Sequence, residues 1–166
     1  YTSSNLWNKA YEAYAKPENN NEFLSWKFTE KIEDDCGETC VDSVNISYSP
    51  PTYASEWQYV SSTKQFERYE GGRIHKDREE NAIVADTIIV QKMDVTVIDN
   101  VGRLRIDTIG SGQVLVFRNG RVIEGEWRKD DRVSRTRFYD VEGVEISLKP
   151  GKIWVSIVGD RHRVEF

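Results

Sequence analysis

Three side chains in the first half of the sequence are of types that could do acid–base chemistry together. They are Arg68, His75 and Asp77, and the last two follow the double glycine Gly71-Gly72. Residues two apart in a strand face the same side, so His75 and Asp77 could form an acid–base pair or provide two metal ligands. Arg68 would then stabilise charge. The alternative is structural, with a surface histidine paired with an aspartate that holds a loop.

No further residue completes a catalytic set around these three. The sequence has no Gly-x-Ser-x-Gly elbow, and the only other histidine is His162. We therefore expect no catalytic residues and no cofactor. If the domain is an enzyme, the candidates are Arg68 for charge stabilisation, His75 for acid–base chemistry and Asp77 for orientation.

Cys36 and Cys40 lie in an acidic stretch that runs from Glu30 to Asp42. With Gly37 between them they could close a small loop, which a disulfide would stabilise by about 2 kcal/mol. Two free thiols are the alternative, and a zinc site lacks a second cysteine or histidine pair. The carboxylates could bind Ca²⁺, but they do not follow an EF-hand pattern, and a solvated loop is simpler. We predict a Cys36–Cys40 disulfide and no metal site.

Aromatic and basic side chains are the candidates for ligand binding. Exposed rings on a β-sheet can stack on sugars or bury the apolar groups of a partner. Trp127 is the first candidate, because Arg128 and Lys129 follow it and Gly125, two residues earlier on the same face of the strand, has no side chain. The alternative for Trp127 is that its ring belongs to the core. For Trp154 a place in the core is the expectation.

These side chains must be positioned by strands that follow a single helix. A helix is expected for residues 3–16, capped by Ser3 or Ser4 and ended by Pro17. From Val44 onward apolar residues recur with the period of two that is typical of strands. The expected strands recur at hairpin spacing with no helix between them: 44–48, 56–59, 65–69, 87–98, 103–108, 113–117, 122–127, 136–139, 144–148, 153–158 and 162–166.

The clearest local signal is the pair Asn119-Gly120 between two apolar strands. Both residues tolerate positive φ, so a type I′ turn is expected to fix the register of this hairpin. Further turns are expected at Asp140–Gly143 and at Lys149–Lys152. Strands joined in this way favour an antiparallel β-sandwich or a partly open barrel. We expect residues 1–43, with the helix and the acidic loop, to pack on a single β-domain of residues 44–166.

Composition argues against a nucleic-acid-binding protein and against a membrane-spanning one. The 166 residues carry 23 basic and 28 acidic side chains, a net charge of −5, which argues against a dedicated nucleic-acid binder. The mean hydropathy of −0.64 and the lack of a long apolar run argue against a membrane span. The basic side chains between Arg118 and Arg137 could face an anionic polymer or lipid headgroups, or they could be solvated strand charges.

A set of short motifs occurs in order along the sequence from residue 66 onward. They are Phe66-Glu67-Arg68, Gly72 to Asp77, Thr87 to Gln91, Gly110-Ser111-Gly112, Val116 to Gly120, Gly125 to Lys129 and Lys149 to Val155. In this order and spacing they resemble the C-terminal domain of the bacterial YerB-type lipoprotein family, whose function is unknown. The resemblance covers essentially the whole chain and departs at Thr87, where the family usually has asparagine.

The resemblance implies a secreted, lipid-anchored precursor with an N-terminal domain that this sequence does not include. It implies no catalytic activity. We therefore expect an extracytoplasmic, non-catalytic domain that binds a protein or a cell-envelope polymer. Membrane attachment would come only through the lipid anchor of the full-length protein, and no nucleic acid is expected as a partner. The alternative is a hydrolase or transferase that acts on envelope material.

Overall fold

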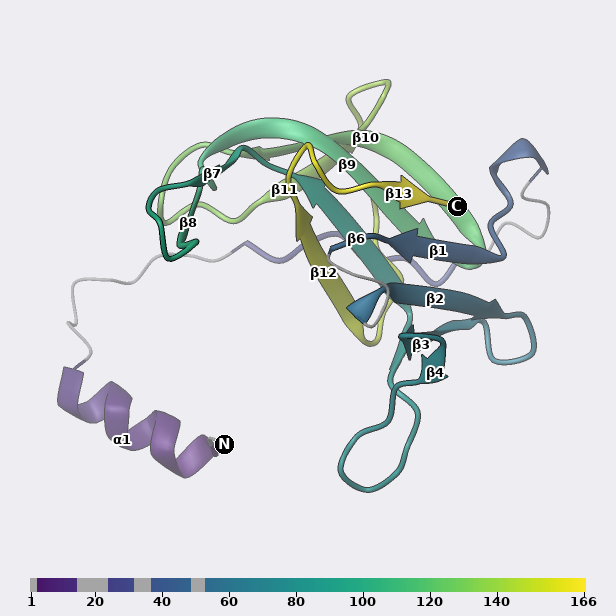
Figure 1. Cartoon of the computed structure of the whole chain (residues 1–166), viewed down its shortest axis with the longest axis horizontal. Helices are drawn as coiled ribbons and strands as arrows, with labels where there is room; N and C mark the ends of the chain where they lie inside the picture. The colour runs from purple at the N-terminus through teal and green to yellow at the C-terminus, as the bar shows by residue number, and fades with distance from the viewer. Residues whose placement is uncertain (1–2, 15–23, 32–36, 49–52) are drawn as a thin grey trace.

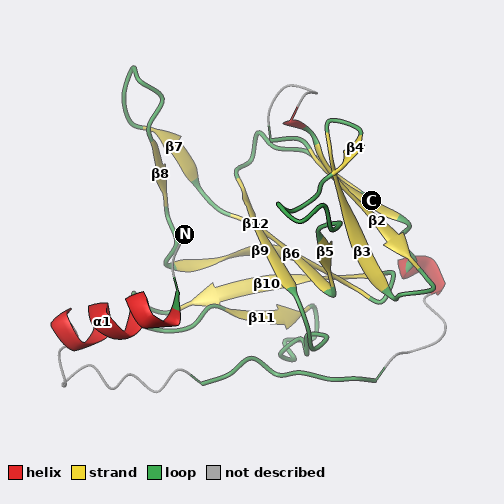
Figure 2. Cartoon of the chain, turned by 90° about the horizontal axis from the view of Figure 1, so that it is seen from below, coloured by secondary structure: helices red, strands yellow, loops and turns green. Residues whose placement is uncertain are grey.

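The structure, a computed structural model, describes residues 3–14, 24–31, 37–48 and 53–166. Within these ranges the chain forms one α-helix, one short 3₁₀ helix (η1, Gly37–Thr39) and thirteen strands, as Figures 1 and 2 show. The strands build two sheets and a separate two-stranded ribbon. The expectation of a mainly β, antiparallel fold with an N-terminal helix is confirmed.

The larger strands form a five-stranded sheet at the centre of the molecule. Three of its four strand pairs are antiparallel, and the fourth, between β6 and β12, is parallel. The order across this sheet is β11 (Arg137–Asp140), β10 (Arg121–Lys129), β9 (Gly110–Arg118), β6 (Thr87–Lys92) and β12 (Ile153–Val158).

A second, six-stranded sheet packs against the first, and all of its described pairs are antiparallel. Its order is β13 (Val164–Glu165), β1 (Ser43–Ile46), β2 (Ser55–Val60), β3 (Gln65–Glu70) and β4 (Arg73–Ile74), with β5 (Val84–Ala85) also on β3. The ribbon consists of β7 (Val95–Val97) and β8 (Leu104–Ile106).

The central sheet is buried on both faces, because alternate residues of β6 belong to two different cores. Ile88 and Val90 pack with Trp57 and Phe66 of the six-stranded sheet. Ile89 packs on the opposite face, in a second core that also holds the aromatic rings of β10 and β11. Strands buried on both faces read as continuous apolar runs, as Ile88-Ile89-Val90 does. The architecture is therefore a sandwich with additional cover on its outer face.

The Asn119-Gly120 turn is formed as expected. Asn119 has φ 52° and Gly120 has φ 68°, the two positive values that a type I′ turn requires. Arg118 pairs with Arg121 across the turn, and the ladder continues to Lys129 opposite Gly110. The ring of Tyr59, from the six-stranded sheet, lies directly against Gly120. The turn therefore also fixes the contact between the two sheets.

Strand β12 departs from the antiparallel arrangement expected from the sequence. It lies parallel to β6, with Trp154 opposite Ile88, instead of continuing a meander with residues 144–148. The backbone of that segment pairs with β11 in a single isolated bridge, between Tyr139 and Glu145. The backbone of Leu148 is bonded instead to residues 27 and 29, at 2.8 and 2.9 Å. A chain segment far away in sequence therefore takes the place that β12 would have filled.

The helix α1 (Ser4–Tyr14) forms at the expected position, but the expectation that it packs on the β-domain is wrong for its described residues. Every one of them is exposed, and Trp7 and Tyr11 are among the most exposed aromatic residues of the structure. Figure 1 shows the helix away from the strands. Its apolar side chains recur at helical spacing without contributing to either core.

Asp86 connects the two sheets, since it lies between β5 and β6 and holds the turn at Lys149–Lys152. Its carboxylate accepts hydrogen bonds from the Lys152 N–H at 2.9 Å and from Gln65 at 3.2 Å, and it lies 3.1 Å from the Lys149 ammonium. Burial acts to raise the pKa of Asp86, but these hydrogen bonds outweigh it and leave the pKa below its ordinary value. The adjoining Thr87 hydroxyl holds the Lys149 backbone.

Replacing Asp86 should destabilise the domain in a pH-dependent way. Because the pKa is lower in the folded state, the carboxylate stabilises the fold above its unfolded pKa, and this stabilisation is lost as the pH falls through the folded value. Asp86→Asn should lower the free energy of unfolding by about 1–3 kcal/mol at neutral pH. Urea titrations at neutral and acidic pH measure this effect. A variant as pH-sensitive as the parent, or no different from Asp130→Asn at an exposed site, would contradict the assignment.

Candidate functional site

Arg68 and His75 are brought together by the β3–β4 turn. The His75 N–H donates to the Arg68 carbonyl at 2.8 Å, and the guanidinium of Arg68 contacts His75 Nδ1. Glu70 Oε2 lies 3.6 Å from the guanidinium and 3.8 Å from His75 Nδ1. The guanidinium also stacks over the ring of Trp154, with 5.0 Å between Cζ and the ring centroid. Arg68 is buried between the sheets, and its charge is balanced locally by Glu70.

Asp77 does not join this cluster. Its carboxylate accepts hydrogen bonds from the N–H groups of Glu79 and Asn81, both at 2.9 Å, and thereby holds its own turn. The hydrogen bond from the Asn81 backbone is the main reason that the pKa of Asp77 lies below its ordinary value. The structure thus places two of the three candidates together and turns the third toward its own loop.

The Arg68–His75 contact is poorly suited to acid–base chemistry. A general base needs a nitrogen aimed at a proton of the substrate, whereas His75 Nδ1 faces a guanidinium. None of the four cavities with described linings includes Arg68, His75 or Asp77. The local arrangement resembles a structural charge cluster at the edge of the core.

Trp127 is not the exposed ring that a ligand-stacking site needs. It is 2% exposed, packs in the second core with Phe138, and donates a hydrogen bond from Nε1 to the Lys92 carbonyl at 2.7 Å. The residue opposite it is Gly112, where a Cβ would come within 2.7 Å of Trp127 Nε1. Gly112, and not Gly125, is therefore the glycine that makes room for the ring, and the prediction of a stacking surface at Trp127 is wrong.

Arg128 and Lys129 do not form a basic surface with Trp127. Arg128 is paired with Glu126, at 2.8 Å from Nε, and stacks over Tyr139 with 4.7 Å to the ring centroid. The Lys129 ammonium contacts the Ser134 carbonyl. Both cations are thus engaged with groups of β10, of β11 and of the segment that joins these strands.

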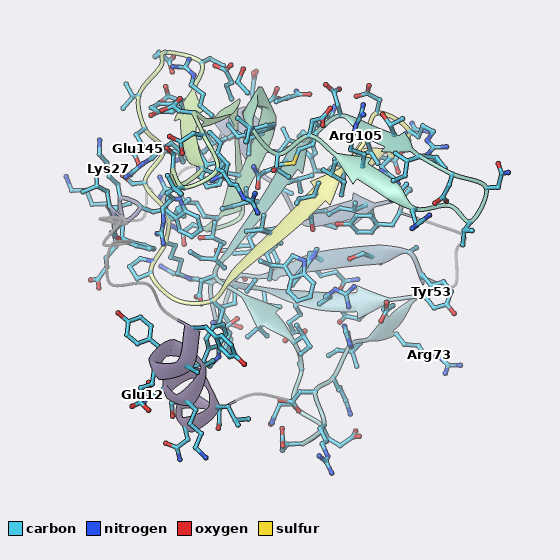
Figure 3. The ribbon with its side chains drawn as sticks, turned by 90° about the vertical axis from the view of Figure 1, so that its left-hand side faces the viewer. Glu12, Lys27, Tyr53, Arg73, Arg105 and Glu145 are labelled. Atoms are coloured by element: carbon cyan, nitrogen blue, oxygen red, sulfur yellow. The ribbon has the colours of Figure 1, made fainter. Side chains whose placement is uncertain are left out.

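The largest of the cavities with described linings, of about 680 Å³, lies between Thr29, Lys31, Glu38 and Thr39 on one side and strand β10 on the other. Its lining carries both signs of charge. The basic side chains are Lys31, Arg118 and Arg121, and the acidic ones are Glu38, Glu124, Asp140, Glu142 and Glu145. Among the lining residues, Glu145 is bound by Arg137 at 2.6 Å and by Lys27 at 3.4 Å, and Figure 3 shows Lys27 and Glu145 together. With both signs of charge present, the lining does not single out an anionic or a cationic ligand.

The cysteine prediction falls partly outside the described residues, because Cys36 is among those that the structure does not describe. Cys40 is disulfide-bonded and sits beside Arg121 in an isolated bridge. The Cys36–Cys40 pairing stays a prediction. The acidic residues Glu33–Asp35 also lie outside the described ranges. In the ranges that are described, no group of His, Cys, Asp and Glu residues is placed to hold a metal ion.

The surface that the sequence interpretation did not identify is the β7–β8 ribbon. Val95 pairs with Ile106 and Val97 with Leu104, whereas Thr96 pairs with Arg105. Alternation therefore puts four aliphatic side chains on one face and the polar pair on the other. Val97, Leu104 and Ile106 remain 46%, 52% and 38% exposed. The alternation within 95–97 and within 104–106 was a signal for this face, but it did not show that no described sheet covers it.

The ribbon is held in shape by its own turn. Asp99 accepts hydrogen bonds from the N–H groups of Val101 at 3.0 Å and Arg103 at 3.1 Å, and the Arg103 guanidinium contacts the same carboxylate. These hydrogen bonds keep the pKa of Asp99 below its ordinary value, and the one from the Arg103 backbone has the largest effect. Figure 2 shows the ribbon projecting from the two sheets, and Figure 3 labels Arg105 on it. An ordered, projecting apolar face is a feature of interaction surfaces.

No helix in the described part of the chain has the length and apolar character needed to cross a membrane.

Comparison with known proteins bears out the resemblance seen in the sequence. Residues 44–155 match the model of the family described as "Protein of unknown function (DUF3048) C-terminal domain". The chain is 32% identical over 107 residues to "Putative lipoprotein YerB" of Bacillus subtilis, a match that covers 63% of this chain and 31% of that protein.

The solved structures include a similar fold. The crystal structure of YerB protein from Bacillus subtilis matches with a TM-score of 0.72 and 25% identity, over 99% of this chain and 55% of that one. The chain therefore spans about a third of the curated relative and about half of the crystallised one. With a family model matched over most of the β-strands, this chain belongs to the family of DUF3048 C-terminal domains.

Proposed function

We propose that the domain is a non-catalytic binding module, located outside the cytoplasm, that attaches to a protein partner through the apolar face of the β7–β8 ribbon. The observation that carries this proposal is the exposed aliphatic face of Val97, Leu104 and Ile106 on a ribbon that belongs to neither sheet. An isolated two-stranded ribbon is marginally stable in water, so covering this face would stabilise it.

The chemistry of the face favours a protein over an envelope polymer or a lipid surface. A sugar-binding surface would present aromatic rings, and an anionic polymer or membrane would call for an excess of cations. The ribbon has neither, since its rim carries Arg103 and Arg105 together with Asp94, Asp99 and Asp107. Aliphatic side chains surrounded by balanced charges are the composition of protein–protein interfaces.

Two observations support a location outside the cytoplasm. The similar protein in Bacillus subtilis is named a putative lipoprotein, a class that is anchored to the outer face of the membrane by lipid. Cys40 is disulfide-bonded, and disulfides persist in oxidising compartments. Membrane attachment would then be supplied by the lipid anchor of the full-length protein. Fractionation of cells that make that protein should recover the domain with the membrane and accessible to external protease.

A photo-crosslinking amino acid at Val101, which is 86% exposed in the ribbon turn, tests the binding surface in the full-length protein in cells. We expect one dominant protein adduct. Leu104→Lys should remove it, because a charge would be desolvated at the centre of the contact. Urea unfolding should be nearly unchanged, since Leu104 is exposed.

Thr96→Lys is the matched control, because it places the same charge on the polar face of the same ribbon. It should leave the adduct intact. An adduct that survives Leu104→Lys, or that is equally lost with Thr96→Lys, would contradict the proposed face. If the protein turns over envelope material, and His75→Ala abolishes this turnover, the alternative function as a hydrolase or transferase would be favoured.

A further inference from the structure

Strand β12 is an unprotected edge of the five-stranded sheet. In the described part of the structure it pairs with β6 alone, and Figure 1 shows it beside β6 at the end of that sheet. Its six residues, Ile-Trp-Val-Ser-Ile-Val, include no charge and no proline. Edge strands are normally short, charged or interrupted by proline, because they offer unpaired backbone groups to other chains.

The other edges of the two sheets follow that rule. The edge strand β11 begins with Arg137 and ends with Asp140, and β13 and β4 are two residues long. Only β12, among the described sheet edges, is both long and uncharged. This difference within one molecule indicates that the β12 edge is covered when the protein functions.

The backbone of β12 offers hydrogen bonds on its free side. The carbonyls of Lys152 and Val158 accept from Thr87 and Met93, at 3.2 and 2.9 Å, so the even-numbered residues point their backbone groups toward β6. Alternation in a strand then directs the N–H and C=O groups of Ile153, Val155 and Ile157 to the open side. Figure 3 looks onto this side, with β12 in front.

The side chains at the same edge are apolar and partly uncovered. Val155 is 42% and Ile157 is 39% exposed, and both stand on the outer face of the sheet. Their partners in the register, Ile89 opposite Val155 and Gln91 opposite Ile157, are both buried. The outer core thus extends to this edge of the sheet, where no described strand covers its last side chains.

We propose that β12 pairs antiparallel with β12 of a second copy of this chain, which would join two five-stranded sheets into one. A two-fold axis through Ser156 puts Val155 of one copy opposite Ile157 of the other and covers the exposed pair. The same register brings Lys152, which directly precedes the strand, near Asp160, which lies in the turn after it, at both ends of the contact, and both residues are exposed. Opposite charges on facing strands attract, and this pair would do so twice. The chain therefore carries its own complementary partner for this edge.

The neighbouring register is less favourable. An axis through Val155 would also pair outward-facing backbone groups, but it places Lys152 opposite Val158 and leaves Asp160 opposite Pro150. The two pairs of opposite charges are then lost. A two-fold contact of this kind uses the same patch on both copies, which is the usual arrangement of a homodimer. Charge thus selects the axis through Ser156.

Sedimentation equilibrium over a thousand-fold range of concentration tests the dimer and its register. Lys152→Asp should weaken association at least about tenfold, because both symmetric pairs become like-charge contacts. Lys152→Asp combined with Asp160→Lys should restore it. A monomer at every concentration, or a dimer indifferent to both variants, would overturn the proposal. The proposal would also be overturned if β12 bound an added extended peptide but no second copy of the chain.

Disulfide crosslinking of introduced cysteines tests directly where the two-fold axis lies. Residues at non-hydrogen-bonded antiparallel positions have Cα atoms about 4.5 Å apart, within the range for a disulfide. Ser156→Cys should give a covalent dimer under mild oxidation. Ile157→Cys should not, because Ile157 faces Val155 and not itself. Equal crosslinking at both positions, in variants that keep the native circular dichroism, would show that the axis does not pass through Ser156.

Discussion

Trp127→Ala should lower the free energy of unfolding by about 3–5 kcal/mol, because it empties a large volume in the outer core. The ring is 2% exposed and packs among Ile89, Val114 and Phe138. The substitution also leaves the Lys92 carbonyl without the hydrogen bond from Nε1. Chemical denaturation followed by far-ultraviolet circular dichroism measures the loss. Any binding by this variant would be lost through unfolding and not through a missing contact.

Two controls separate packing from surface effects at this site. Arg128→Ala, at the exposed neighbour, should change stability by less than about 1 kcal/mol, the usual range for surface ion pairs. Trp127→Phe should fall between the two, because it keeps part of the ring and loses the hydrogen bond. If Trp127→Ala is no worse than Arg128→Ala, the tryptophan is not part of the core.

Gly120→Val should destabilise the domain by about 3 kcal/mol, for two reasons that add. A β-branched residue is strained at the φ of 68° observed here. The new Cβ would also come within 2.6 Å of the Tyr59 ring, which is pinned between the sheets. A thermal or urea unfolding curve gives the difference from the parent protein.

Gly143→Val isolates the two causes. Gly143 has a φ of 80°, so the backbone strain is similar, but nothing lies within 4 Å of an added Cβ. The difference in free energy of unfolding between the two variants therefore measures the cost of the steric clash with Tyr59. Equal effects would mean that the ring moves aside without cost, and an unchanged midpoint for Gly120→Val would exclude the type I′ turn.

Local signals predicted the parts of the fold that depend on few residues. The Asn119-Gly120 turn needs only positive φ at two neighbouring positions, which these residue types tolerate. The helix at Ser4–Tyr14 follows from capping and spacing. Arg68 and His75 were singled out together, and the short β3–β4 turn brings them into contact. In each case the decisive interactions lie within a few residues of each other.

The errors arose where distant segments decide the outcome. β12 alternates as any strand does, and nothing in its sequence states that β6 lies beside it in parallel. Trp127 is buried because Gly112 opposite it has no side chain, a pairing visible only once the register is known. Asp77 holds a loop, as the structural alternative had it, but it does not pair with His75, because its carboxylate accepts hydrogen bonds from its own turn instead.

The place of β12 and β13 in the chain has a consequence for how the domain is made. Five other strands are synthesised between β6 and its parallel neighbour β12, and β13 completes the other sheet later still. Pairings this distant in sequence form slowly, and apolar strands stay accessible until they do. Neither sheet is therefore complete until β12 and β13 have been synthesised, and until then the apolar strands that they pair with stay uncovered.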